Sequence, residues 1–532
     1  AAWEGRTDRL QEKDRELNKL YTTYRARLQA RNLYDVDGLY RLAISFLEAN
    51  EAKLPWKKLY FSEFYQFDDL QRELIRALSK SCDIQIGIFF DGQRPELSKA
   101  TLNAYGDLAG LDFQVIKEPA KIKRAGSLAF IVENWQKMGH KKIEPQGITL
   151  LEATSPEREM AGVITSIKKL IAQGTNPGDI VVLVRSLTDY AGFSDMFKAY
   201  GVPTSLPQVT SFSGQALPDF LVKLLKTAVN PNKVEAWQNL LATEYCSELY
   251  GVDKAKLEEE YNSKFFPTGN SLLAFLKTAF PAASLDELVA LVKNFSKKHT
   301  GKEFVDILST ELAHWDMSGR AGKAYQQDAI DLDRIKILAG CENFCLKILQ
   351  DMELAFAQSG KDEEKITVDE FLTIWLDLSK DATITLQKGN AGGIQVLEAA
   401  NVQGVTFPYV FLMGLREGVF PKIKFENWLY NDKERALLHD LGINLQQTSA
   451  NVAMDRYFFG TALAMATDEL HMSYYADDIA GPSGYVEEMA QYFPPQTWQA
   501  EKFTITGNNC AGKQELLNFL AQLPQLGDKE QA

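Results

Sequence analysis

Short apolar runs alternate with helical patterns along the first part of the chain. Before about residue 55, leucines and a tyrosine recur at helical spacing among many charged residues, which predicts helices. Three apolar runs then have the length and composition of strands, and they are KLYF at Lys58, IQIGIFF at Ile84 and FQVIK at Phe113. Strands that alternate with helices in this way usually form a parallel sheet, so an α/β unit is expected here.

A second α/β unit is predicted from Ile148 onwards. The run ITLLEA is a predicted strand, and Ser155 followed by Pro156 predicts the start of a helix. The serine oxygen can accept hydrogen bonds from free backbone amides, and proline already has the φ angle of a first helical residue. An apolar helical face follows and ends at Gly174, after which DIVVLVR, ending at Arg185, is the next predicted buried strand.

The pattern changes to long helical periods between about residues 213 and 382, as in LPDFLVKLLKTAV. Strand patterns return in IQVLEA at Ile394, YVFLMG at Tyr409 and LHMSY at Leu470. The simplest interpretation is an α/β domain with a mainly parallel sheet, interrupted in sequence by a large helical insertion.

Size and composition limit the classes of protein to which the chain can belong. Its 532 residues exceed one ordinary hydrophobic core, which predicts two to four domains. A net charge of -13 argues against coating nucleic acid by bulk electrostatics, although a local basic groove remains compatible with it. No apolar run reaches the length of a membrane span and the first residues do not resemble an export signal, so we expect a cytoplasmic protein without a membrane partner.

The cysteines and histidines do not predict a metal site. Among the five cysteines only Cys341 and Cys345 are close in sequence, and they lie in a stretch of helical period. The five histidines form no pair with the spacing of zinc ligands. We therefore expect reduced cysteines in or near the core and no metal or cofactor bound by this chain.

The stretch LYFSEFYQFDDLQRELIRAL, from Leu59 to Leu78, reads as a strand that leads into a helix. It resembles the segment of superfamily 1 DNA helicases of the UvrD and Rep type in which Asp-Glu-Phe-Gln-Asp follows a strand. Glu63 matches the acidic second position and Gln71 a later glutamine, whereas Ser62 replaces the aspartate that would hold magnesium. Because a serine hydroxyl is a weak substitute for a carboxylate ligand of Mg²⁺, the resemblance implies a vestigial catalytic site.

Two further segments resemble nucleotide-facing parts of the same helicases. Arg185 stands where the family has an arginine that reaches the terminal phosphate, so Arg185 and Gln71 are expected to face a nucleotide. In MDRYFFGTALAMATDELHMSYY, Met465 occupies the position of the arginine finger. A thioether cannot stabilise the charge that develops on a transferred phosphoryl group, so Met465 is also interpreted as vestigial.

The most specific resemblance is in IQVLEAANVQGVTFPYVFLMGLREGVFP, which keeps the shape of a helicase segment while its charged positions differ. The family segment serves DNA and the ribose of the nucleotide. The DNA-binding residues that this resemblance implies are Gln403, Gly404, Thr406, Lys422 and Lys424.

A phosphate-binding loop is not found in the sequence. Four Gly-Lys pairs occur, but none is followed by Ser or Thr or has the spaced upstream glycine. In the helicase plan this loop would lie upstream of every segment described above. The chain therefore resembles a fragment whose amino-terminal part has been removed.

These degenerate segments, in this order, resemble the AddB/RexB-type subunit of bacterial ATP-dependent helicase-nucleases. The resemblance implies a UvrD-like architecture with two RecA-like domains and a helical insertion. The expected parts are the end of the first RecA-like domain behind a helical segment (1–145), the first part of the second RecA-like domain (146–212), the insertion (213–383), the rest of the second domain (384–480) and a C-terminal tail (481–532). Magnesium and ATP are then expected only in a parent complex, and an iron-sulfur cluster only in a nuclease domain outside this sequence.

The leading functional hypothesis is a non-catalytic scaffold that binds DNA and works with an AddA-like motor subunit in the processing of double-strand breaks. A longer parent protein would then belong to an ATP-dependent deoxyribonuclease or helicase. One alternative is an active superfamily 1 helicase whose phosphate loop lies in a missing amino-terminal part. Another is a protein-interaction module that never contacts DNA.

Overall fold

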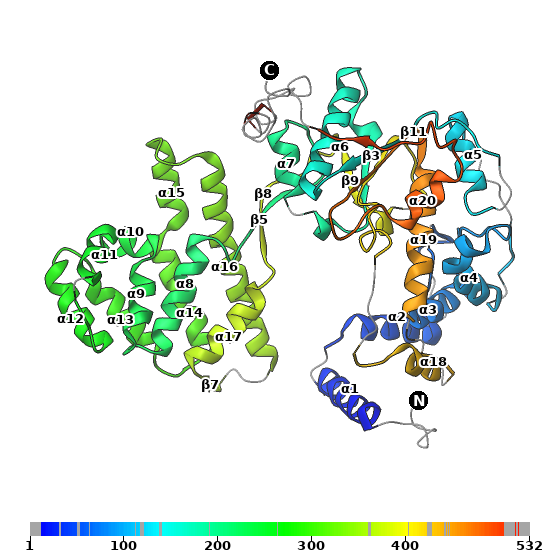
Figure 1. The fold of residues 1–532 in the computed structure, drawn as a ribbon. Coiled ribbons are helices and arrows are strands. Elements are labelled where there is room, and N and C mark those ends of the chain that lie inside the picture. Colours follow the sequence, from blue (N-terminus) through cyan, green and yellow to red (C-terminus); the bar gives the residue numbers. More distant parts are fainter. Residues whose placement is uncertain are drawn as a thin grey trace. The chain divides into compact units, whose positions relative to one another are not determined.

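The computed structural model describes most of the chain as two compact units. The described residues are 12–30, 33–50, 54–62, 64–111, 113–116, 122–137, 141–190, 192–262, 264–359, 363–402, 404–422, 428–440, 443, 445, 447–504, 516–517 and 520. One unit combines residues 1–206 with residues 389–532, and the other comprises residues 207–388. They are called the first and the second unit below, and each is described by itself (Figure 1).

The first unit is built on a six-stranded sheet in which all neighbouring strands are parallel. The strands, in their order across the sheet, are β12 (Glu501–Lys502), β3 (Ile148–Ala153), β11 (Ala466–Tyr475), β10 (Phe407–Leu412), β4 (Ile180–Val184) and β9 (Gln395–Glu398). Every residue of β4 is buried, as expected for a central strand of a sheet that is covered on both faces. The predicted α/β class with a mainly parallel sheet is thus confirmed.

Helix α6 (Pro156–Ala172) covers one face of this sheet and begins where the sequence predicts. The Ser155 side chain accepts a hydrogen bond from the backbone N–H of Arg158 at 3.3 Å, and Pro156 is the first helical residue. Val163 and Ile164 pack against alternate β4 residues such as Val182. The other β4 side chains point to the opposite face, because successive side chains of a strand alternate.

Helix α19 (Thr448–Met465) lies on that opposite face and is buried on nearly all sides (Figure 1). It contacts β10 and β11 of the sheet, and also α4 (Pro95–Ala109) and α5 (Gly126–Asn134). Gly460 allows α19 to approach the layer formed by α4 and α5 closely. A Cβ atom at this position would lie 2.5 Å from Leu97 Cδ1 and 2.9 Å from Trp135 Cζ3. The helix is therefore a core element with neighbours on both sides.

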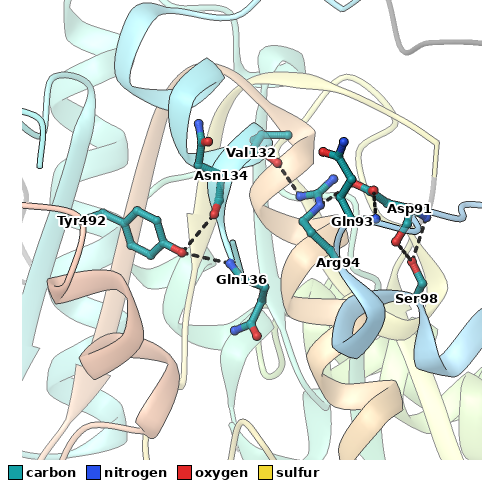
Figure 2. Close-up of polar contacts among 8 residues, drawn as sticks. All are labelled: Asp91, Gln93, Arg94, Ser98, Val132, Asn134, Gln136 and Tyr492. Atoms are coloured by element: carbon teal, nitrogen blue, oxygen red, sulfur yellow. Dashed lines mark hydrogen bonds and ion pairs between the residues drawn. The ribbon is translucent and has the colours of Figure 1, made fainter. Parts of the chain in front are cut away.

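Polar contacts hold the layer of α4 and α5 in place (Figure 2). Arg94, at the start of α4, donates from Nε to Asp91 Oδ2 and from Nη1 to the carbonyl oxygen of Val132, each at 2.6 Å. Tyr492, which follows α20 (Gly484–Ala490), donates its hydroxyl to the carbonyl oxygen of Asn134 at 3.1 Å. The C-terminal end of α5 is thus bonded to two segments that are distant in sequence.

The described residues before residue 122 include a small two-stranded parallel sheet and several helices. β1 (Lys58–Phe61) pairs with β2 (Asp83–Ile86), and Ile84 and Ile75 are buried in the cluster beneath them. The strand predicted at Phe113 is wrong, because residues 113–116 form no strand and Val115 and Ile116 are 54% and 74% exposed. With respect to the described residues, both side chains are mostly exposed, so they gain little from the burial that stabilises a strand. Besides α4, the helices of this part are α1 (Glu12–Ala30), α2 (Val36–Asn50) and α3 (Asp69–Ser79).

The second unit is mainly helical and has its own core. Its helices are α8 (Ala216–Val229), α9 (Val234–Leu241), α10 (Glu244–Tyr250), α11 (Lys254–Asn262), α12 (Gly269–Ala279), α13 (Leu285–Phe295), α14 (Gly301–Trp315), α15 (Met317–Gln326), α16 (Leu332–Ser359) and α17 (Val368–Ser379). Two short antiparallel pairs accompany them, β5 (Gln208–Ser211) with β8 (Thr383–Gln387) and β6 (His299–Thr300) with β7 (Lys365–Ile366). Cys341 and Cys345 are fully buried free thiols in this core. None of the helices in the described ranges has both the length and the apolar composition that a membrane span requires.

Replacement of Gly460 by alanine should destabilise the first unit. The new Cβ would overlap Leu97 and Trp135, and overpacking of this kind typically costs about 1–3 kcal/mol. Gly106→Ala is the matched control, because Gly106 lies within α4 itself and a Cβ there meets nothing within 4 Å. The control should gain up to about 1 kcal/mol from the higher helix propensity of alanine. Urea unfolding of both variants measures the difference, and equal midpoints would contradict the tight contact.

Candidate functional site

The carboxyl ends of the parallel strands lie at one edge of the sheet, which is where ligands of open α/β sheets usually bind. After β4 the chain leads to β9 on one side, and after β10 it leads to β11 on the other side. The two connections diverge, so the crevice between the ends of β4 and β10 is the expected ligand position. Arg185 directly follows β4 and Gly414 lies just after β10.

Arg185 is held in this crevice by a buried ion pair. Its Nε donates to Oδ1 of Asp455 on α19 at 2.7 Å, and the two side chains are only 12% and 3% exposed. The guanidinium carbon lies 5.3 Å from the centre of the Phe458 ring, where a cation–π interaction adds to the ion pair. The structure therefore shows an arginine anchored to α19, and its expected role toward a nucleotide stays a prediction.

A second buried carboxylate, Glu159 on α6, lies at the same edge of the sheet. It is fully buried and accepts hydrogen bonds from the Tyr190 hydroxyl at 2.7 Å, the backbone N–H of Gly414 at 2.9 Å and the Ser473 hydroxyl at 2.6 Å. Burial raises the pKa of Glu159 above its ordinary value, and burial next to this carboxylate raises the pKa of Tyr190. Sequence reasoning missed Glu159, although it lies one helical turn before Val163 of the predicted apolar face.

These two carboxylates fix both ends of the turn that follows β10. Glu159 accepts the N–H of Gly414, and Oδ2 of Asp455 accepts the N–H of Lys422 at 2.6 Å. Gly414 has a φ of 76°, and a Cβ there would lie 2.9 Å from the Tyr190 hydroxyl oxygen, so this position requires glycine. The polar groups of Arg185, Glu159 and Asp455 at the sheet edge are thus bonded to other groups of the protein itself.

The charged residues of this turn have acidic neighbours. Arg416 donates to Asp477 Oδ1 at 2.6 Å and lies over the ring of Tyr475 at 4.6 Å. Lys422, which was expected to bind DNA, has its Nζ 3.6 Å from Asp189 Oδ1, and its side chain is 38% exposed. A phosphate that contacts Lys422 would therefore compete with Asp189 for the lysine ammonium group.

A separate open cleft of about 550 Å³ lies next to β1. Its described lining residues are Ser62, Phe64, Tyr65, Gln66, Asp68, Gln71, Ala400 and Asn401. The cleft brings together two of the predicted site positions, Ser62 and Gln71, with the short turn η4 (Ala399–Asn401) after β9. Arg185 and Met465 are not among the described residues that line it.

Gln71 has a structural role at this cleft. Its backbone N–H donates to Asp68 Oδ1 at 2.7 Å, and its side-chain oxygen accepts from the N–H of Asp68 at 3.1 Å. This reciprocal pair is a capping box that starts α3. The side-chain oxygen of Gln71 is therefore already engaged in holding the helix.

The remaining predicted positions do not converge on one site. Met465 is 3% exposed and packs in the apolar core at the end of α19, so a side chain there cannot reach a ligand from this position. Gly404 and Thr406 are exposed in the loop before β10, away from the carboxyl ends of the strands. Glu63, Gln403 and Lys424 lie outside the described residues.

Comparison with known proteins gives consistent matches. A family model described as the UvrD-like helicase C-terminal domain matches residues 126–477, which is more than half of the chain. The B subunit of the ATP-dependent helicase/deoxyribonuclease of Listeria monocytogenes is 21% identical over 524 residues, covering 88% of this chain and 44% of that protein. The subunit of the same name from Caldanaerobacter subterraneus is 22% identical over 71% of this chain and 35% of its own length. The chain spans less than half the length of these curated relatives, and the matches confirm the resemblance predicted from its motifs.

Removal of Asp455 should strongly destabilise the first unit. Asp455→Ala leaves the Arg185 guanidinium buried without its carboxylate, which typically costs about 3–5 kcal/mol in the free energy of unfolding. Asp219→Ala is the matched control, because Asp219 forms a partly exposed pair with Lys223, and ion pairs in contact with solvent contribute at most about 1 kcal/mol. Urea unfolding compares the variants. The double variant Arg185→Met, Asp455→Leu should cost less than the sum of the single ones, and strict additivity would argue against a coupled pair.

Glu159 should make the stability of the first unit depend on pH. Because its pKa is raised in the folded state, the folded chain binds the proton more tightly than the unfolded chain. Protonated Glu159 therefore stabilises the folded state. This contribution to the free energy of unfolding is fully present below the ordinary pKa of 4.5, and it is lost as the pH rises through the raised pKa. The difference in unfolding free energy between the natural chain and Glu159→Gln should therefore shrink from pH 4 to pH 8. Glu157→Gln, an exposed change on the same helix, is the control, and a pH-independent difference for Glu159→Gln would contradict the assignment.

Proposed function

Because the chain belongs to the family of UvrD-like helicase C-terminal domains, we propose that it is a helicase-like scaffold that binds DNA without hydrolysing a nucleotide. The observation that carries this proposal is that the charged and polar groups at the sheet edge are already bonded to one another. Arg185 is paired with Asp455, and Glu159 and Tyr190 occupy the space beside Gly414. A site that must bind a phosphate and change its contacts during hydrolysis would need some of these groups to be available.

The loss of the other catalytic groups supports the same proposal. Ser62 stands in place of a magnesium-binding carboxylate, and Met465 is buried where a transition-state arginine would be needed. The cleft that contains Ser62 has no Lys, Arg or His among its described lining residues. Glu63 and Gln403, which are close in sequence to the lining residues Ser62 and Asn401, carry no positive charge either. These features disfavour a triphosphate in the cleft.

The relatives, each named as the B subunit of an ATP-dependent helicase/deoxyribonuclease, suggest the setting of this scaffold. In the proposal, the chain is part of an AddB-like subunit, works with an AddA-like motor subunit and guides DNA during double-strand-break processing and recombinational repair. ATP and magnesium would then be used by other parts of the complex, and an iron-sulfur cluster would belong to a nuclease domain. Such a complex would act in the cytoplasm.

The purified chain should bind single-stranded and forked DNA in a salt-dependent manner. A plot of the logarithm of the binding constant against the logarithm of the salt concentration should have a negative slope. Each phosphate contact that is lost should reduce the magnitude of this slope by about 0.7–0.9. Lys422→Ala should weaken binding about equally for different sequences, because a lysine–phosphate contact carries no sequence information. Lys277→Ala is the matched control, since Lys277 is an exposed lysine of the second unit that is paired with Asp286. Fluorescence anisotropy over a salt series measures both variants.

Two outcomes would overturn the proposal. One is the absence of DNA binding at moderate salt even with the motor subunit present, which would favour a protein-interaction module. The other is DNA-stimulated ATP hydrolysis by the full-length protein alone that Glu63→Gln abolishes. That result would establish the active helicase that the sequence leaves open.

A further inference from the structure

A second hollow of the first unit lies between α6 and the sheet. It is bordered by residues 163–173 of α6 and by residues 149–151 and 469–473 of the strands β3 and β11, and it is called the α6 hollow below. Its volume is about 330 Å³, which lies within the range of about 300–1,000 Å³ that is typical of small-molecule sites. None of the roles proposed above uses this hollow.

The α6 wall of the hollow departs from the apolar pattern of that helix. Gly162, Ser166, Lys169 and Gln173 follow one another at intervals of three or four residues, so they lie on one side of α6. The helix lies close to β3 at Gly162, because a Cβ atom there would be 3.1 Å from Leu151 Cδ1. The short Ser166 side chain donates its hydroxyl to the Gly162 carbonyl oxygen at 3.1 Å and thus turns back onto the helix. Space therefore remains between the last turns of α6 and the sheet.

The floor of the hollow carries a fixed negative charge. Glu469 Oε2 lies 3.0 Å from His471 Nε2. The ring N–H points only partly toward this oxygen, yet the contact with His471 lowers the pKa of Glu469 below its ordinary value. The His471 ring is itself held, because its Nδ1 lies 2.8 Å from Thr149 Oγ1 and it stacks on Phe411 with ring centres 4.4 Å apart. Glu469 is therefore an ionised carboxylate on a rigid support.

The rim of the hollow adds charges of both signs. Glu501 of β12 contributes a second carboxylate, and Lys169 is the only cationic side chain among the described lining residues apart from the histidine. Lys169 is exposed and forms no ion pair with another described residue. The sheet side of the hollow is thus anionic and the helix side cationic. A ligand with charge of one sign only would meet a like charge on one of these sides.

Branched apolar side chains complete the lining. Leu151 of β3 and Val163 and Leu170 of α6 belong to it, and Leu151 and Leu170 are only partly buried in the absence of a ligand. A small aliphatic group that enters the hollow would cover these side chains and leave water itself, which is favourable.

We propose that the α6 hollow binds a small zwitterion, namely a free α-amino acid with an aliphatic side chain. Its ammonium group pairs with Glu469 and Glu501, and its carboxylate pairs with Lys169. Its side chain packs against Leu151 and Leu170. Each kind of group in the lining then has a matching partner, which neither a simple anion nor a simple cation would provide. The proposal does not rest on the proposed binding of DNA.

Calorimetric titration of the chain with leucine and with its two singly charged analogues tests the ligand class. Isocaproate lacks the ammonium group of leucine, and isoamylamine lacks its carboxylate. Each analogue should bind at least about tenfold more weakly than leucine, because one charge-assisted contact is lost. The absence of saturable leucine binding at millimolar concentrations would overturn the proposal, and so would an analogue that binds as tightly as leucine.

Two variants assign the charges of the ligand to the two sides of the hollow. Glu469→Gln should weaken the binding of leucine and isoamylamine but not that of isocaproate. Lys169→Met should weaken the binding of leucine and isocaproate but not that of isoamylamine. Lys168→Met is the matched control and should change none of these affinities, because Lys168 is the adjacent residue of α6 but lies over the ring of Tyr200.

Urea unfolding of the three variants confirms that each is folded before its affinity is compared. Glu469→Gln keeps the size of the side chain and Lys169 is exposed, so both variants should unfold at nearly the natural midpoint. Leucine binding of unchanged affinity in both folded variants would place the amino acid elsewhere on the chain and overturn the proposal.

Discussion

The structure of the first unit depends on the burial of α19 on both of its sides. A helix that is apolar nearly all round cannot be stable at the surface of a sheet unless a second layer covers it. Here α4 and α5 form that layer, and Gly460 sets how closely they approach. The same helix supplies Asp455 to the sheet edge, and its Phe458 packs against Tyr65, which lines the cleft. Both candidate sites are therefore positioned by one packing requirement.

Residues that would serve catalysis in an active relative have structural partners in this chain. Gln71 closes a capping box, and Arg185 neutralises a carboxylate that would otherwise be buried without a partner. Such roles give these segments a structural reason to keep their shape. Helix capping and the satisfaction of buried charges contribute to folding whether or not a nucleotide binds.

The sequence predicted the local elements of the fold better than the contacts of the site. The strands at Lys58, Ile148 and Ile180 and the helix start at Ser155 follow from apolar runs and capping chemistry, which act over a few residues. The strand expected at Phe113 failed because an apolar run needs a neighbouring layer, and that is not a local property.

Long-range partners could not be predicted from single residues. Asp455 is far from Arg185 in sequence, and nothing in its local pattern marks it as the partner of that arginine. Glu159 was missed for the same reason, since its three donors come from three different segments. The positions Ser62 and Gln71 were found because their segment resembles a helicase motif, whereas the cleft that they line together with Asn401 required the fold.

The turn after β10 has a mechanical consequence. One of its ends is bonded to a helix on one face of the sheet, through Glu159, and its other end to a helix on the opposite face, through Asp455. A sliding of either helix along the sheet would stretch this short connection or break a buried hydrogen bond. The turn thus links the helical layers on the two faces of the sheet to each other through one short connection.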